Sequence, residues 1–347
     1  MKLSILDQSL ISYNQTAHEA LQESMNLAKM GEELGYIRYW IAEHHAIPGL
    51  ACPAPEIMLS YIGAQTKTIR IGSGAVLLPH YRPYKVAEVF NMLATLFPGR
   101  IDMGIGRAPG GSAEATNALS ENFLQQVRKM PELVEELLHF VGNDFPADHE
   151  YAKLSAYPIP LIAPMPWLLG TSKKSALLAA EKGVPYAFGQ FMSGNGGEEI
   201  IQQYRDHFHS RKHEQKPHVL LTVSTICAET NKKAQEIALS SLIWSLKKTN
   251  GVGDRVVPSI EEVMKYPLNE KEQKMIENMK QKIIIGDPNE VKAKLIEIQR
   301  QYKVDEMMLL TNTYTPKDRK DSYQLIADVF DLANRNDDTT TESFPID

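Results

Sequence analysis

Short apolar runs alternate with longer amphipathic stretches along most of the chain. Each apolar run has the length of a buried strand, whereas the stretches between the runs repeat their apolar residues with the period of a helix. The pattern predicts strands at 3–6, 38–42, 69–77, 101–105, 167–169, 186–188, 219–226 and 307–310. It predicts helices at 17–34, 55–65, 83–96, 120–140, 173–181, 198–209, 231–247, 288–301 and 318–333. The chain is therefore expected to consist of repeated strand–helix units.

A series of about eight such units is typical of a (β/α)8 barrel, the TIM barrel. A doubly wound parallel sheet shares the alternation but usually has fewer strands in a chain of this length. We therefore predict one TIM-barrel domain over residues 1–336, with an insertion near the last βα units. The segment 248–287 interrupts the alternation and is either a lid or capping segment or a structural insertion without a catalytic role. Residues 337–347, rich in Asp and Thr, are expected to form a disordered tail.

The composition narrows the class of protein. The 347 residues carry a formal net charge of −6, which argues against nucleic acid as a main partner. No apolar run approaches the length of a membrane span, and the first residues lack the regions of a signal peptide. The two cysteines, Cys52 and Cys227, form neither a disulfide framework nor a zinc motif. We expect a cytoplasmic protein without a nucleic-acid, membrane or metal partner.

The predicted strand 38–42 ends in one acid and two histidines, Glu43, His44 and His45. Side chains alternate along a strand, so His44 shares a face with Trp40, whereas His45 shares the opposite face with Glu43. The two histidines therefore point apart and cannot bind one metal ion together without a kink. A titratable group at the end of a buried strand favours an active-site role for His44 as an acid, a base or a hydrogen-bond donor. A pair of structurally satisfied histidines is the alternative.

Two further segments suit an anion and a flat ligand. Residues 170–175 follow a predicted strand and begin a helix, where free N–H groups and the hydroxyls of Thr171, Ser172 and Ser175 suit a phosphate. Arg107, at the end of another strand, is able to pair with the same group, although simple N-capping also explains the hydroxyls. The strand around Gly72 and Gly74 fits either a flat ring lying against it or tight barrel packing.

These motifs together resemble the bacterial luciferase-like flavin monooxygenases, over most of residues 1–335. The resemblance rests on WIAEHH at 40–45, GSGAVLLP at 72–79 and GRIDMGIGR at 99–107, in this order and near this spacing. It implies that His44 is the catalytic histidine beside the flavin and that Gly74 and Ala75 lie against the isoalloxazine ring, where family members often have a non-proline cis peptide. It also implies that Arg107, Thr171, Ser172 and Ser175 bind the flavin phosphate.

The resemblance further implies a two-component monooxygenase, in which a separate flavin reductase supplies reduced FMN. The enzyme would use O2 on a small organic substrate, such as an aldehyde, and would form a homodimer through the helices at 55–65 and 83–96. Light emission is not implied, because Gly106 stands where luciferase has its reactive cysteine. The alternatives are a deazaflavin-dependent dehydrogenase, a non-catalytic flavin-binding protein, and a phosphate-handling isomerase or lyase that uses Glu43 as its base.

Overall fold

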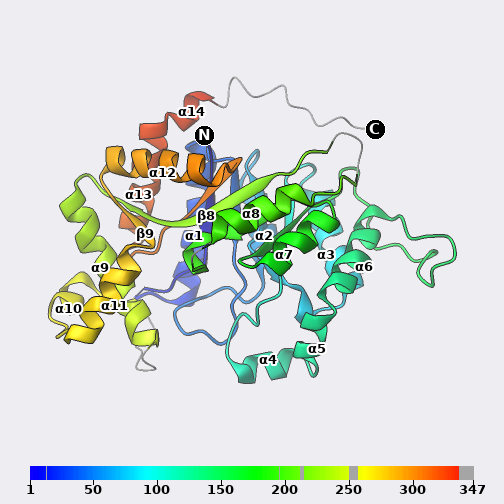
Figure 1. Cartoon of the computed structure of the whole chain (residues 1–347), viewed down its shortest axis with the longest axis horizontal. Helices are drawn as coiled ribbons and strands as arrows, with labels where there is room; N and C mark the ends of the chain where they lie inside the picture. Colours follow the sequence, from blue (N-terminus) through cyan, green and yellow to red (C-terminus); the bar gives the residue numbers. More distant parts are fainter. Residues whose placement is uncertain (13, 195, 212–214, 250–256, 336–347) are drawn as a thin grey trace.

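Eight parallel strands close into a barrel in the computed structural model, which describes residues 1–12, 14–194, 196–211, 215–249 and 257–335 (Figure 1). The barrel closes because β10 pairs with both β1 and β8. The TIM barrel predicted from the sequence is confirmed. Its strands are β1 (Lys2–Asp7), β2 (Arg38–Ile41), β3 (Arg70–Ser73), β5 (Ile101–Gly106), β6 (Met165–Gly170), β7 (Tyr186–Gly189), β8 (Val219–Cys227) and β10 (Glu306–Leu310).

Each predicted strand has a counterpart, but the one predicted at 69–77 is divided in two. β3 ends at Ser73, and a short strand β4 (Val76–Leu77) follows, which pairs with β5. Gly74 and Ala75 lie between the two strands and are joined by a cis peptide bond. Strand alternation alone does not predict this break.

Helices cover the outside of the barrel, and several begin at a proline, as predicted. Proline lies in the first turn of α2, α3 and α12, where its missing N–H costs no hydrogen bond. The predicted helix at 120–140 is divided, and α6 begins with Pro131 in its first turn. The helices around the barrel are α1 (Ala17–Glu33), α2 (Pro55–Gln65), α3 (Pro83–Leu96), α4 (Ala113–Leu119), α5 (Phe123–Arg128), α6 (Met130–Gly142), α7 (Lys173–Glu181), α8 (Gly197–Asp206), α12 (Pro288–Tyr302), α13 (Pro316–Phe330) and α14 (Leu332–Arg335), with single turns η1 (Leu78–His80) and η2 (Gln190–Met192).

The side chains of each strand separate into two cores. Tyr39 and Ile41 of β2 pack outward into the layer between the barrel and its helices. Trp40 and Ala42 point into the barrel, where the Trp40 ring meets Trp167 edge to face at 5.3 Å. This alternation is the one predicted for the strand that leads to His44.

The predicted insertion forms a small unit beside the barrel. β8 is long enough to pair with β10 through its first half and with β9 (Ile283–Gly286) through residues 224–227. Helices α9 (Asn231–Thr249), α10 (Ile260–Met264) and α11 (Glu270–Lys280) pack with β9 around a separate hydrophobic cluster. β9 was not predicted, because three isoleucines directly after a charged helix are too short a run to separate from it. Residues 250–256, and the predicted tail at 337–347, lie outside the described residues.

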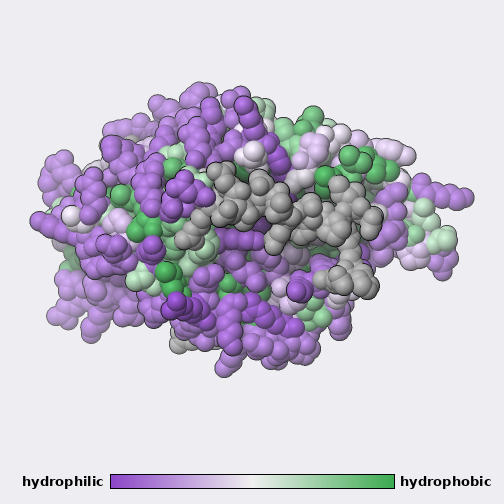
Figure 2. Space-filling model, turned by 90° about the horizontal axis from the view of Figure 1, so that it is seen from above, coloured by the Kyte–Doolittle hydropathy of each residue, from purple (hydrophilic) through white to green (hydrophobic). Residues whose placement is uncertain are grey.

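The two ends of the barrel differ in what surrounds them. α4 and α5, which follow β5, lie beyond the lower end in Figure 1, whereas α10 and α11, which follow β8, lie at the left of the barrel. Seen from above, the opposite side of the molecule is mainly hydrophilic, with small hydrophobic patches (Figure 2). No helix among the described residues is long and apolar enough to cross a membrane.

Candidate functional site at the C-terminal end of the barrel

Arg107 and the first turn of α7 come together at the C-terminal end of the barrel. Arg107 follows β5 and is exposed, and its guanidinium donates a hydrogen bond to the Ser172 hydroxyl at 3.1 Å. Ser172 is the N-cap of α7, and its hydroxyl oxygen accepts the Ser175 N–H at 3.3 Å. A guanidinium beside the positive end of a helix is a favourable place for an anion. The two separate pieces of the predicted anion site are therefore neighbours.

Thr171 and Ser175 lie on either side of this cap. Thr171 is half-buried at the end of β6. Ser175 is buried, and its hydroxyl donates to the Ser172 carbonyl oxygen at 2.7 Å and contacts the Tyr186 hydroxyl at 3.0 Å. Burial raises the pKa of Tyr186 to about 12. Simple N-capping, the alternative interpretation of these hydroxyls, is confirmed for Ser172. The Arg107 guanidinium adds a positive charge at the same end of the helix.

The strand with the two glycines is packed tightly from inside the barrel. A Cβ atom on Gly72 would lie 2.7 Å from both the Trp40 ring and the Asp102 side chain. A Cβ atom on Gly74 would lie 2.6 Å from the Leu6 side chain. Such distances leave no room for a side chain, so barrel packing accounts for both glycines without a bound ring.

Gly106, the last residue of β5, is packed as tightly as the two glycines. Ala75 is buried, and a Cβ atom on Gly106 would lie 2.9 Å from the Ala75 methyl group. Any larger residue at position 106 would push into Ala75. Ala75 and Gly106 therefore pack against each other directly before Arg107.

His44 comes two residues after Ala42, which packs inside the barrel, and strand alternation predicts that the His44 side chain lies on the same face. The side chain is half-buried, and the backbone N–H donates to the Cys52 carbonyl oxygen at 2.9 Å. Burial raises the pKa of the Cys52 thiol to about 12, which makes this neighbour a poor nucleophile at neutral pH. His44 stays the predicted active-site histidine of the segment that follows β2.

Glu43 and His45 contact each other in a buried polar cluster. The Glu43 carboxylate accepts hydrogen bonds from the Tyr81 hydroxyl at 2.7 Å and from the Leu77 N–H at 3.0 Å. The His45 Nε2 atom lies 2.7 Å from the same carboxylate. A carboxylate held by three donors is badly placed as a base for a ligand at Arg107. The arrangement weighs against the isomerase or lyase alternative.

A solvent-open cavity of about 580 Å³ lies at the surface beside this end of the barrel, between the loop after Arg107 and helices α4 and α5. His80 lies next to it: its Nε2 atom is 3.0 Å from the Pro109 carbonyl oxygen, and its ring stacks on Phe123 at 4.7 Å. Among the described lining residues Glu121 is the charged one, and the others are apolar, amide or hydroxyl residues. The sequence analysis did not find this cavity, because α4 was not predicted.

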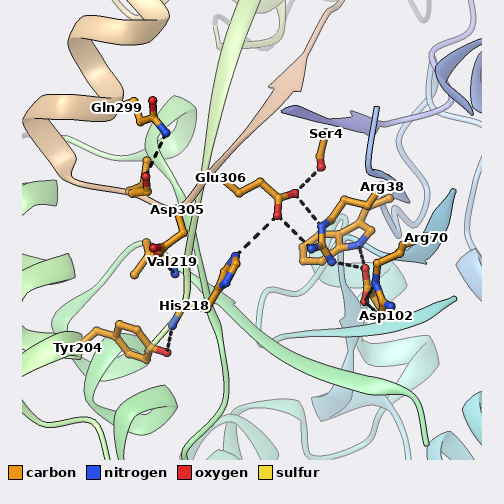
Figure 3. Close-up of polar contacts among 12 residues, drawn as sticks. Ser4, Arg38, Arg70, Asp102, Tyr204, His218, Val219, Gln299, Asp305 and Glu306 are labelled. Atoms are coloured by element: carbon orange, nitrogen blue, oxygen red, sulfur yellow. Dashed lines mark hydrogen bonds and ion pairs between the residues drawn. The ribbon is translucent and has the colours of Figure 1, made fainter. Parts of the chain in front are cut away.

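A cluster of buried charges fills the barrel at its N-terminal end (Figure 3). The Arg38 guanidinium donates to Asp102 at 2.7 Å and to Glu306 at 2.7 and 3.0 Å. Arg70 donates to Asp102 at 2.6 Å, and the Ser4 hydroxyl donates to Glu306. This cluster was not predicted from the sequence, because only the residues at the C-terminal ends of the strands were considered as site residues. Charged residues within the predicted strands, such as Arg38 and Asp102, could have indicated the cluster.

The carboxyl groups of this cluster are stabilised in their charged form. Burial by itself raises the pKa of Asp102, but the Arg38 and Arg70 guanidinium groups outweigh it and leave the pKa below its ordinary value. The pKa of Glu306 is also lowered, because Arg38 and the hydrogen bonds around the carboxylate outweigh the effect of burial. Among the described residues, no group of three or more His, Cys, Asp and Glu side chains is arranged to hold a metal ion.

A TIM barrel with polar groups and a cavity at its C-terminal strand ends has the organisation of a barrel enzyme. The sequence model of the luciferase-like monooxygenase family matches residues 1–304, and the chain belongs to this family. The resemblance found in the sequence motifs is thereby confirmed.

Similar proteins include a monooxygenase with a named substrate class. The chain is 40% identical over 339 residues to an N-acetyl-S-alkylcysteine monooxygenase of Bacillus subtilis, covering 96% of this chain and 100% of that protein. The crystal structure of apo-MsnO8 is 32% identical and has a TM-score of 0.87, with 95% of this chain and 98% of that chain covered. The oxygenating constituent of 3,6-diketocamphane monooxygenase from Pseudomonas putida, solved with FMN, shares the fold at 17% identity and a TM-score of 0.67, covering 94% of this chain and 97% of that one.

Proposed function

We propose that the protein is the oxygenase of a two-component flavin monooxygenase, which takes reduced FMN from a separate reductase and uses O2 on a small organic substrate. The observation that carries the proposal is the exposed Arg107 guanidinium, 3.1 Å from the Ser172 hydroxyl at the N-terminus of α7. An FMN phosphate would be held there by charge-assisted hydrogen bonds. Thr171 and the first-turn N–H groups would complete this phosphate site, with Ser175 holding the N-cap in place.

The rest of the site also fits a flavin. Gly74, Ala75 and Gly106 have small side chains or none, and an isoalloxazine ring would lie against Gly74 and Ala75, as the family resemblance implies. Reduced FMN supplies the electrons that activate O2, and the protein supplies orientation and exclusion of water. His44 would hold or accept a proton beside the ring. The organic substrate would approach through the cavity bordered by α4 and α5.

The proposed test is anaerobic titration of the purified protein with reduced FMN, oxidised FMN and a reduced deazaflavin. Reduced FMN is expected to bind most tightly, and oxygenation of the organic substrate is expected to require an added flavin reductase and NADPH. Tight binding of the deazaflavin alone would replace the proposal by a dehydrogenase. Binding of FMN without any oxygenated product, over a panel that includes aldehydes and alkyl thioethers, would indicate a flavin-binding protein without turnover.

We also propose a homodimer formed through α2 and α3. Met58, Leu59 and Phe90 on these helices are buried in the chain's own core. Other apolar residues on the two helices are exposed to solvent: Ile57, Tyr61, Met92 and Leu96. An exposed apolar patch of this kind favours association. Analytical ultracentrifugation at micromolar concentration is expected to give a dimer, and a clean monomer would refute this part of the proposal.

A further inference from the structure

A buried carboxylate lies between strand ends that carry the proposed site. Glu43 is 3% exposed and follows β2, directly before His44. It accepts a hydrogen bond from Leu77, the last residue of β4, and another from Tyr81, which follows η1. The Leu77 N–H is two residues beyond Ala75, which the proposed function places against the ring. This hydrogen bond connects the Glu43 carboxylate, which follows β2, to the backbone of β4.

His45 extends the same connection to the loop after β5. Its Nε2 atom lies 2.7 Å from the Glu43 carboxylate, and its backbone N–H donates to the Gly110 carbonyl oxygen at 2.8 Å. A Cβ atom on Gly111 would lie 1.9 Å from the His45 carbonyl oxygen, so the two backbones touch closely. This contact lies three to four residues beyond Arg107. The position of the loop that begins at Arg107 is thus linked to Glu43.

We infer that Glu43 is a positioning residue, which holds the β4 segment after Ala75 and the loop after Arg107 in a fixed arrangement around His44. The inference rests on the proposed function in one respect, that these residues contact a flavin. Glu43 itself touches neither cofactor nor substrate in this account. The two oxygen atoms of the Glu43 carboxylate accept hydrogen bonds from all three donors. A glutamine amide has one oxygen and one NH2 group, so its NH2 group would face at least one of the donors.

Asp7 provides a matched control, because it is an equally buried carboxylate at a neighbouring strand end. Asp7 is 3% exposed at the end of β1 and also has three donors. They are the Ser9 N–H at 3.0 Å, the Tyr39 hydroxyl at 2.5 Å and the Arg319 guanidinium at 3.0 Å. None of these donors belongs to β4 or to the loop after Arg107. A loss of global stability should therefore appear when either carboxylate is replaced by its amide. A local change in β4 and in the loop after Arg107 should appear only when Glu43 is replaced.

The experiment compares Glu43→Gln and Asp7→Asn with the wild type by amide hydrogen exchange on the protein without added flavin. In Glu43→Gln, residues 74–78 and 107–111 are expected to exchange about tenfold faster, as for the local loss of one charge-assisted hydrogen bond. In Asp7→Asn, these two segments are expected to keep the wild-type rates. Equal acceleration in both variants, or acceleration spread over the whole barrel, would overturn the inference.

A second readout uses oxidised FMN as the probe. Glu43→Gln is expected to bind FMN about tenfold more weakly and to shift the visible absorption of the bound flavin, with Asp7→Asn unchanged in both respects. Unchanged affinity and spectrum in Glu43→Gln would also overturn the inference. If the wild type binds no flavin, the proposed function fails, and the exchange experiment still decides the role of Glu43.

Tyr81→Phe is the second variant, in case Glu43→Gln fails to fold. It removes one donor to Glu43 and is expected to give the same exchange pattern at smaller amplitude. Wild-type exchange rates in Tyr81→Phe would contradict the inference.

Discussion

The two ends of this barrel use arginine in opposite ways. At the N-terminal end, Arg38 is buried and its guanidinium is shared between the Asp102 and Glu306 carboxylates. At the C-terminal end, Arg107 is exposed, and the contact that the structure gives its guanidinium is a neutral hydroxyl, that of Ser172. One cation is neutralised by the protein itself, and the other keeps its charge available for a ligand.

The difference separates stability from binding within one fold. A buried charge must be paired, because an unpaired one costs several kcal/mol, so the N-terminal cluster is fixed and holds strands together. A cation at the surface beside a helix N-terminus adds little to stability and is able to bind an anion. This division agrees with the tendency of TIM barrels to have their stabilising residues at one end and their active site at the other.

The largest effect expected at the C-terminal end is on the reaction rate. His44→Ala should slow turnover by about 100- to 10,000-fold, the usual cost of losing a general acid or base, with a much smaller change in stability. His45→Ala is expected to be milder, because His45 faces the Glu43 cluster. The measurement is a stopped-flow absorbance record of bound flavin after the reduced complex is mixed with oxygen. Identical records for His44→Ala and wild type, together with normal substrate turnover, would make His44 a structural histidine.

The largest effect expected at the N-terminal end is on folding. Glu306→Gln removes one carboxylate from Arg38 and should lower the free energy of unfolding by about 3–5 kcal/mol, as for breaking a buried ion pair. Urea denaturation measures the change. Glu261→Gln is the control, because the Glu261–Lys265 pair lies on the surface, and its loss should not move the midpoint measurably. A midpoint for Glu306→Gln as high as that of the control would show that the buried cluster contributes little.

A smaller effect is expected from acid, and its sign follows from the same cluster. The pKa values of Asp102 and Glu306 are lower in the folded protein than their ordinary values of about 4. Their contribution to stability is therefore complete above about pH 5 and is lost as the pH falls through the lowered pKa values. Urea midpoints measured from pH 7 to pH 3 should fall less steeply for Glu306→Gln than for wild type. If the urea midpoints of the two proteins fall in parallel, other carboxyl groups are responsible for the acid unfolding.

The sequence predicts local features of this fold well. The eight barrel strands and the inward and outward faces of β2 follow from periodicity over a few residues. The starts of α2, α3 and α12 follow from their prolines, which suit the first turn of a helix. The neighbouring positions of Arg107 and the α7 N-terminus follow from barrel topology, since both lie at C-terminal strand ends.

Contacts between distant parts of the chain were not predictable in this way. Ser4 and Glu306 are 302 residues apart, and nothing in either local pattern indicates that the two residues meet. The donors around Glu43 likewise depend on the break between β3 and β4, which the pattern of residues 69–77 hides. Strand register decides such contacts, and periodicity does not give the register between strands.

The most direct test of the central claim compares FMN with riboflavin, which has the same ring and lacks the phosphate, on the wild type and on Arg107→Ala. If Arg107 binds the flavin phosphate, the wild type should bind FMN more tightly than riboflavin, and Arg107→Ala should lose about 1.5–3 kcal/mol of binding free energy for FMN alone. The preference for FMN over riboflavin should shrink in the variant by the same amount, and Thr171 and the first-turn N–H groups of α7 should account for the preference that remains. An equal loss for both ligands, or unchanged FMN affinity in Arg107→Ala, would contradict the assignment of this end of the barrel as the phosphate site.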